Sequence, residues 1–395
     1  MKAEINICTE DFTIEMQWLL HLLSRRFRGG VPAPRTAPCA RRFLQTAQYH
    51  RVTTVIADSL VACPPEWMSS PMIQQIQVIQ KRSSFRALRR LHALLDLKDE
   101  MKSLSLPFIN IKGLSLSQKL YGDTYTRSCG DIDFWVTEEA VTPVIECFVK
   151  QGFTSKTGFE TLHPHYQQKF MRLTNHIGFM NGDTSIELHW RLTPHFRLFP
   201  VAFDEAFEAS ERISIQGHEF NILGPEHLLP HLLVHGACHI WERLHWLTDI
   251  AALTQKPSAL LPSSEWSRAH QLHTPLLGGL HLSAALIGHF PPPTWPGMTP
   301  EQSGSLKKHL QLSLKQLKMS PASKRRLSAR DHFTNQMQLI AGWQAKVSFL
   351  KTEFYAPGNW KDLKLPPHLG LLYLFWRPIA YLRGKLGANE GRSPS

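Results

Sequence analysis

Two acidic residues occupy one face of a short apolar segment. Asp131 and Asp133 flank Ile132 in the segment 131–136. In a β-strand, residues two apart point to the same face, so the two carboxylates would converge while Ile132 and Phe134 face a core. Carboxylates that close repel each other unless a cation lies between them. The segment therefore predicts a divalent-metal site, or, as the simpler alternative, a strand end with solvated acids.

The surroundings of this segment favour the metal site. An apolar strand ends at Lys112 and Gly113, and a short helix with Ser115 in its first turn follows. Free N–H groups at the start of a helix can hold phosphate oxygens. Glu187 and His189 share one face of a later alternating strand. Acids on neighbouring strands beside a phosphate-binding turn are typical of phosphoryl transfer with two metal ions.

The rest of the chain is dominated by helical patterns. Apolar positions recur mostly every three or four residues over 71–103, which predicts one long helix. Residues 170–179 and 184–192 alternate around Asn181-Gly182 and predict an antiparallel hairpin. Strands are also expected at 108–111 and 131–136, and helices at 18–27, 40–60, 114–121, 142–150, 225–254, 265–287, 307–317 and 330–352.

These patterns predict an α+β protein, in which a small mixed sheet lies between N-terminal and C-terminal helical regions. The chain of 395 residues is long enough for two or three structural units. We divide it into 1–39 (helix and Pro-rich linker), 40–104 (helical), 105–222 (α/β core), 223–290 (helical) and 291–395 (basic and helical).

The charge favours polyanionic partners. Lysine and arginine exceed the acids by 12, and residues 301–395 carry most of this excess, with 16 basic against 5 acidic side chains. Such a charge suits nucleotides, nucleic acid or an anionic membrane. The cluster Lys324-Arg325-Arg326 lacks interleaved aromatic residues that would stack bases, so we expect a solvated turn and no stable nucleic-acid binding.

The apolar segment 369–382 is too short to span a bilayer, and Arg377 and Pro378 interrupt it. Its aromatic and leucine side chains have basic neighbours, which would suit peripheral contact with an anionic membrane. Packing against the helical regions is the alternative that we prefer.

The cysteines and the N-terminus indicate a reducing compartment. The 6 cysteines lack the spacing of a zinc site or a disulfide framework. Residues 1–17 contain early acids and no apolar signal-peptide core. We therefore expect a cytoplasmic protein.

A longer motif surrounds the two aspartates. A strand ending in Lys-Gly at residues 106–113 precedes a Leu-Tyr pair, an arginine and Gly-Asp-Ile-Asp at 120–136. This combination resembles the signature of a bacterial family of uncharacterised nucleotidyltransferases in the DNA polymerase beta-like superfamily. That superfamily also contains kanamycin nucleotidyltransferase and CCA-adding enzymes. The resemblance continues through 186–192 and 235–249, and more weakly through 360–367 and 373–378.

The resemblance implies a polymerase-beta-type core that transfers a nucleoside monophosphate from an NTP to an unidentified acceptor. It implies ATP as the first candidate NTP and Mg²⁺ or Mn²⁺ as the cofactor. Asp131 and Asp133 match the catalytic metal-binding pair, and Glu187 matches the third catalytic and metal-binding acid. The alternatives are kinase-like phosphoryl transfer at the same site and a non-catalytic binding or assembly subunit. Three mutually repelling acids argue against the non-catalytic alternative.

The same resemblance implies a set of nucleotide-binding residues. Gly113 matches the glycine that lets the backbone approach a triphosphate. Lys112 and Arg127 match this family's pattern and have the charge to meet phosphates. Many superfamily members have Gly-Ser or Gly-Gly here, whereas Leu114 separates Gly113 from Ser115 in this chain. Leu114 is therefore the departure from the usual pattern, and Ser115 stays among the expected nucleotide-binding residues.

Three histidines, His231, His235 and His239, lie four residues apart on one expected helix. The spacing allows a zinc site, but no glutamate takes the place that a metalloprotease helix requires. Helix packing is the main alternative. We also weigh a third interpretation, in which His235, His239 and Arg243 line the nucleotide or acceptor cleft. Asp249 is expected to orient a neighbour, and His163, His165 and His176 are expected to be solvated loop residues.

Overall fold

A computed structural model of the chain describes residues 7–193, 196–256, 267, 271–288, 290, 297–319, 327–355, 369 and 372. The basic cluster 324–326 lies outside the described residues. So does the apolar segment 369–382, apart from Leu369 and Leu372, together with the motifs at 360–367 and 373–378. The expectations attached to these segments stay predictions.

Seven strands form one mixed sheet in the order β3-β4-β5-β2-β1-β7-β6. Neighbouring strands are antiparallel except for β2 with β5 and β1 with β7, which are parallel. The β2–β5 register pairs Asp133 with Glu187. The strands are β1 (Ile109–Asn110), β2 (Ile132–Trp135), β3 (Thr154–Ser155), β4 (His176–Asn181), β5 (Thr184–His189), β6 (Glu211–Ile215) and β7 (His218–Ile222).

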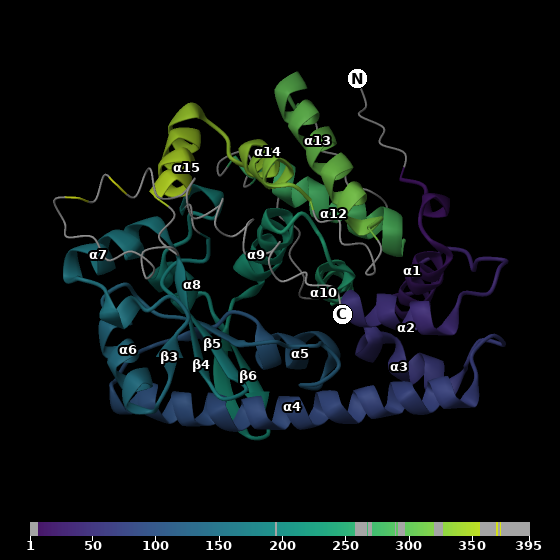
Figure 1. Cartoon of the computed structure of the whole chain (residues 1–395), viewed down its shortest axis with the longest axis horizontal. Coiled ribbons are helices and arrows are strands. Elements are labelled where there is room, and N and C mark those ends of the chain that lie inside the picture. Colours follow the sequence, from purple (N-terminus) through teal and green to yellow (C-terminus); the bar gives the residue numbers. More distant parts are fainter. Residues whose placement is uncertain are drawn as a thin grey trace, which may run out of the picture.

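Helices precede, interrupt and follow the sheet, and the long helix α4 runs along one side of the whole molecule (Figure 1). The first are α1 (Ile14–Arg26), α2 (Ala40–Tyr49), α3 (Thr53–Ala62), α4 (Ser70–Ser103) and α5 (Gly113–Tyr121). Within the core are α6 (Val141–Lys150), α7 (Pro164–Leu173) and α8 (Phe203–Glu208). The last are α9 (Pro225–Cys238), α10 (Leu244–Thr254), α12 (His273–Ile287), α13 (Pro300–Leu317), α14 (Ala329–Leu339) and α15 (Trp343–Tyr355).

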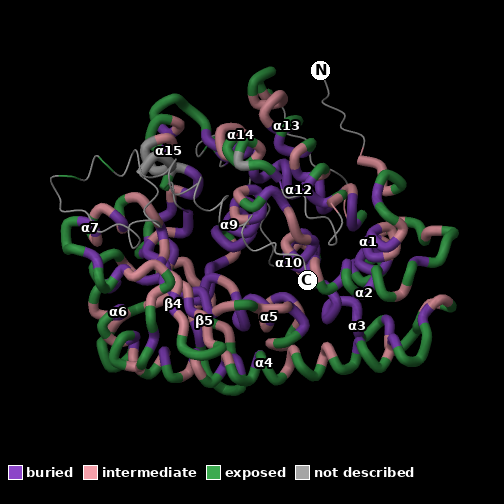
Figure 2. The backbone as a smooth tube through the Cα atoms, viewed as in Figure 1, coloured by how far each residue is buried: buried purple, intermediate pink, exposed green. Residues whose placement is uncertain are grey.

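Two hydrophobic clusters hold these elements together. One joins the N-terminal helices to α9, α10, α12 and α13. The other packs the C-terminal half of α4, together with α6 and α7, against the sheet, with Phe134, Phe148 and Phe179 at its centre. The outer face of α4 is exposed along much of its length (Figure 2). The site lies where the sheet and the C-terminal helices meet.

The predicted fold class is confirmed: a small mixed sheet lies between helical regions. The long helix is also confirmed as α4. The strand predicted for 170–179 is wrong at its start, because residues 170–173 form the last turn of α7. Tyr166 and Phe170 are buried one helical turn apart on this helix, and Phe170 was mistaken for the first residue of an alternating strand.

Three helices predicted as continuous are each divided into two. Arg51 has a positive φ of 57° between α2 and α3, and Gly342 has one of 78° between α14 and α15. Ile240 and Trp241 have φ values of 55° and 50° after α9. This backbone reversal brings the Trp241 ring against Gly236 and Gly279, where added Cβ atoms would lie 2.3 and 2.4 Å from ring atoms. The chain therefore turns back after α9 at the point where the Trp241 ring packs against these two glycines.

The β6–β7 hairpin was not predicted. Its turn residues, Gln216 and Gly217, both have positive φ, at 49° and 82°, as a tight type I′ turn requires. Apart from Ile215, Phe220 and Ile222, most side chains of this hairpin are exposed or half-buried. The hydrophobic alternation is therefore weak.

Candidate active site

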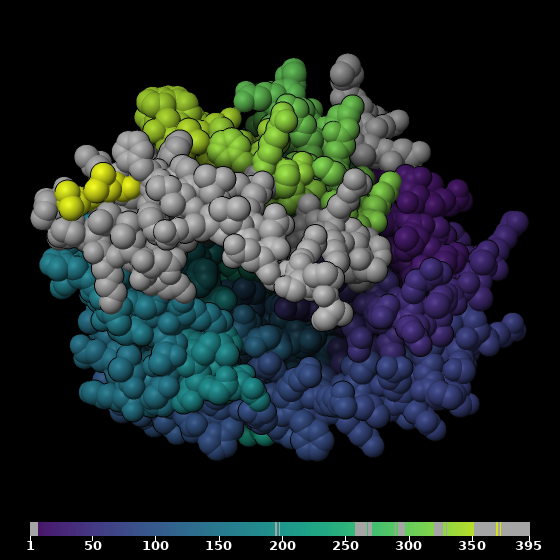
Figure 3. All heavy atoms as spheres, viewed as in Figure 1, coloured from purple at the N-terminus to yellow at the C-terminus, as the bar shows by residue number. Residues whose placement is uncertain are grey.

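A cavity of about 490 Å³ lies between the sheet and the helices α9 and α10. The surface is visibly hollowed between the teal core and the purple N-terminal helices (Figure 3). This volume lies within the range of small-molecule sites. The lining includes Arg51, Lys112, Arg127, Gly130, Asp131, Asp133, His176, Glu187, His189, His231, His235, Cys238, His239, Glu242, Arg243, His245 and Trp246.

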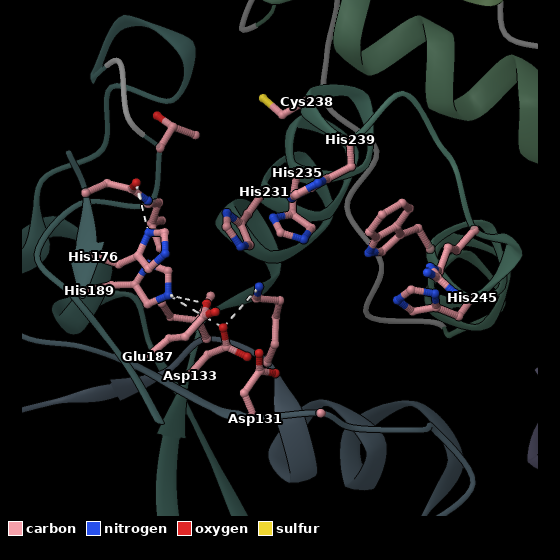
Figure 4. Close-up of a pocket in the computed structure, with 18 of the residues that line it drawn as sticks. Asp131, Asp133, His176, Glu187, His189, His231, His235, Cys238, His239 and His245 are labelled. Atoms are coloured by element: carbon pink, nitrogen blue, oxygen red, sulfur yellow. Dashed lines mark hydrogen bonds and ion pairs between the residues drawn. The ribbon is translucent and has the colours of Figure 1, made fainter. Parts of the chain in front are cut away.

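Acids from β2 and β5 meet at the floor of this cavity (Figure 4). Ile132 and Phe134 are buried in the core, so Asp133 of β2 and Asp131, directly before this strand, face the cavity. The parallel pairing sets Glu187 of β5 beside Asp133. The structure thus brings together the three acids that the sequence singled out.

His189 joins this cluster from the end of β5. Its Nε2 lies 3.5 Å from Asp133 Oδ1 and 3.5 Å from Glu187 Oε2. The His176 ring stacks on it, with 4.9 Å between ring centroids. His176 is therefore a half-buried strand residue in the cavity wall, and the expectation of a solvated loop histidine is wrong.

Lys112 supplies the nearest cation to the cluster. Its Nζ lies 3.2 Å from Asp133 Oδ1, and the Asp133 side chain is only 3% exposed. Burial alone would raise the pKa of Asp133, but Lys112 and His189 outweigh it and hold that pKa well below its usual range. Burial would likewise lower the pKa of His189, but its contacts with Asp133 and Glu187 raise it.

Asp131 behaves differently from Asp133. Burial, followed by the charges of Asp133 and Glu187, raises the pKa of Asp131 to about 6. Burial and the repulsion among the three acids therefore raise the pKa of Asp131, whereas Lys112 and His189 offset them at Asp133.

The donor set fits a divalent cation. Ligand atoms of Asp133, Glu187 and His189 all lie within 4.8 Å of one another, and within the described ranges no other set of three such side chains does so. Apart from its ion-pair contacts, Asp133 Oδ1 has no hydrogen-bond partner among the described residues, and neither do the buried ring nitrogens of His189. Carboxylate oxygens suit Mg²⁺ and Mn²⁺, and an imidazole nitrogen suits transition-metal ions.

Aromatic and histidine side chains form the opposite wall. His239 stacks on Trp246 with 5.0 Å between ring centroids, and His235 lies 4.7 Å from His239 by the same measure. Burial, followed by the charge of Lys112, lowers the pKa of His239 to about 4 and that of His231 to about 3. These rings are neutral at pH 7. The zinc interpretation of this helix finds no support, because its histidines belong to no such ligand group among the described residues.

Arginines complete the lining. Arg127 is 7% exposed, and its Nε donates to both carboxylate oxygens of Asp249 at 3.1 and 3.0 Å. Asp249 thus orients a neighbour, as predicted. Arg243 lies 4.5 Å above the Tyr49 ring and also bonds to the Tyr49 carbonyl.

Gly113 and Ser115 do not line the cavity. Gly113 begins α5 with a φ of 70°, and a Cβ there would lie 3.4 Å from the Asp131 carbonyl oxygen. Ser115 is 1% exposed, and its hydroxyl has no hydrogen-bond partner among the described residues. Their contact with a triphosphate stays a prediction.

Several lining residues were not singled out from the sequence. His189 could have been included, because it shares a strand face with Glu187. Arg51 carried no local signal and reaches the cavity through the packing of distant segments, whereas Trp246 lies within the segment 235–249 that resembles the family.

Acids on neighbouring strands of a mixed sheet, beside lysine and arginine, are typical of enzymes that act on phosphate groups. A family model described as uncharacterised nucleotidyltransferase matches residues 38–288, and the chain belongs to this family. The match confirms the resemblance found in the sequence and supports nucleotidyl transfer as the general activity. No match to the chain was found among curated proteins or among solved structures.

Among the described residues, no helix has both the length and the apolar character needed to cross a membrane.

Proposed function

We propose that the protein transfers a nucleoside monophosphate from an NTP, with ATP as the first candidate, to a hydroxyl of an acceptor. The acceptor oxygen bonds to the α-phosphorus, and the bond from that phosphorus to the oxygen of the β-phosphate breaks. Pyrophosphate leaves with that oxygen. The observation that carries the proposal is the convergence of Asp133, Glu187 and His189, within a chain segment matched by the nucleotidyltransferase family.

Asp133, Glu187 and His189 would hold a divalent ion, with Asp131 beside them. When bound, such an ion would activate the acceptor oxygen and neutralise charge on the triphosphate. Glu187 is the candidate acceptor of the hydroxyl proton. Its side chain is 25% exposed, against 3% for Asp133, so an incoming substrate meets it first.

The cationic side chains would position the triphosphate. Lys112 stands beside Asp133, and Arg127 is fixed by Asp249 with one edge toward the cavity. The His239 and Trp246 rings lie within 22° of parallel and offer an aromatic face for a base, and the neutral His235 ring stands edge-on to Trp246 at 79°. In this proposal Arg243 closes the same wall.

Label transfer tests the proposal. The protein is incubated with each α-³²P-labelled NTP, with γ-³²P-labelled ATP, with Mg²⁺ or Mn²⁺, and with a lysate fraction that contains acceptors. We expect α-label in a product and pyrophosphate release. Product labelled only from the γ-position would replace the proposal with phosphoryl transfer.

Asp133→Asn should abolish the label transfer. Asp99→Asn, an exposed aspartate on α4, is the matched control and should leave it unchanged. Undiminished transfer by Asp133→Asn would refute the assigned site.

A further inference from the structure

A second, cationic opening adjoins the active-site cavity. A groove of about 210 Å³ runs between α2, α3 and α4, and Arg51 and Ser128 line both this groove and the cavity. Arg86 lines the groove and also a further depression of about 300 Å³ with Arg89 and Arg90. The shared lining residues set these three openings side by side along a path from the cavity to the surface of α4, the long helix of Figure 1. We call this path the arginine groove.

The positive charge of the arginine groove is little compensated. The guanidinium groups of Arg51 and Arg86 form no ion pair and no hydrogen bond with any residue that the structure describes. Arg90 donates to the Gly130 carbonyl at 3.2 Å, and its Nε is buried without a partner there. The groove is lined by a single acid among the described residues, Asp183, and Arg89 engages it at 3.0 Å.

The arrangement suits phosphate more than other ligands. Guanidinium groups present planar pairs of donors that match phosphate oxygens, and several around one groove favour a multiply charged anion. The Ser128 hydroxyl and the Gln48 amide line the same groove, whereas the Ser83 hydroxyl there already donates to the Tyr125 carbonyl at 3.0 Å. No lining residue among those described is aromatic, so the groove lacks the stacking platforms of a single-strand nucleic-acid site.

We propose that the arginine groove is the acceptor subsite and that the acceptor is a small molecule bearing phosphate. This inference rests on the proposed nucleotidyl transfer. The groove holds the acceptor's phosphate while its hydroxyl reaches the cavity past Arg51 and Ser128. Acceptor and NTP thus enter from different sides, with Arg51 and Ser128 between them.

Anion binding tests the groove without any transfer reaction. Inorganic tripolyphosphate is titrated calorimetrically into the full chain at low salt, without NTP and with a chelator present. Arg86 is the residue to change, because it lies outside the active-site cavity. Arg86→Gln should weaken binding about tenfold, as expected for one lost charged donor. Arg86→Lys should recover part of the loss, and the exposed Arg172→Gln on α7 is the matched control.

Two results would overturn the inference. One is no binding by the wild type or equal affinity in Arg86→Gln, with circular dichroism showing both proteins folded. The other is that a single-stranded oligonucleotide binds far more tightly than tripolyphosphate and that its binding depends on Arg86. That result would assign the groove to a nucleic-acid backbone. Failure of nucleotidyl transfer is distinguishable, because α-label incorporation would be absent while Arg86-dependent binding persists.

Discussion

Acidification should destabilise the protein through its buried histidines, and His309 isolates one such contribution. His309 on α13 is fully buried. Its Nδ1 lies 2.7 Å from Asn335 Oδ1, and its Nε2 accepts the Trp241 indole N–H at 3.2 Å. The neutral ring satisfies both partners, because Nδ1 donates and Nε2 accepts. Protonation would place a second donor against the Trp241 N–H.

The size of the effect follows from the pKa. Burial, only partly offset by Asn335, lowers the pKa of His309 to about 4, against about 6.5 in an unfolded chain. The unfolded state therefore binds the proton first as the pH falls, and stability is lost below about pH 6.5. Between pH 8 and pH 5 this one group should remove about 2 kcal/mol from the free energy of unfolding.

Urea unfolding at pH 8 and pH 5 measures this contribution in the wild type and in His309→Gln. The variant should be less stable at pH 8, and the difference between the two proteins should shrink by about 2 kcal/mol at pH 5. The exposed His218→Gln should keep the wild-type pH dependence. Parallel stability curves for the wild type and His309→Gln would refute the reasoning.

Three substitutions test the charges and packing around the site, each by denaturant unfolding. Asp131→Asn should stabilise the protein by about 1–3 kcal/mol at pH 7 and by much less at pH 4, because it removes the repelled carboxylate; an unchanged stability at pH 7 would contradict this. Asp249→Ala should cost about 3–5 kcal/mol, because it strands the buried Arg127, and a loss under 1 kcal/mol would mean that Arg127 finds another partner. Gly279→Ala should cost about 1–3 kcal/mol through collision with Trp241. Gly304→Ala on α13, where an added Cβ meets no atom within 4 Å, should be neutral or stabilising.

The parts of the fold that follow local periodicity could be predicted from the sequence. The alternation around Asp133 and Glu187 placed both on sheet strands, and their common cavity follows from the β2–β5 register. Strand pairing depends on contacts distant in sequence, so periodicity alone did not reveal the β6–β7 hairpin, with its largely exposed side chains.

The cavity walls illustrate the same limit. Arg127 and Asp249 are 122 residues apart, and only the folded chain brings them together. Arg51 carries no motif and reaches the site because the chain reverses between α2 and α3. His176 is the first residue of β4, and its stacking on His189 follows from the β4–β5 register, which pairs the two residues and which periodicity alone does not give.

The central claim is that Asp133, Glu187 and His189 form the divalent-metal site of a nucleotidyltransferase. Electron paramagnetic resonance of bound Mn²⁺ tests it most directly, because pulsed spectra detect a nitrogen ligand. We predict a Mn²⁺ site with a ¹⁴N coupling that His189→Asn removes, and loss of binding in Asp133→Asn and Glu187→Gln but not in Asp99→Asn. Mn²⁺ binding that survives both acidic substitutions, or a wild-type spectrum without ¹⁴N coupling, would contradict this assignment.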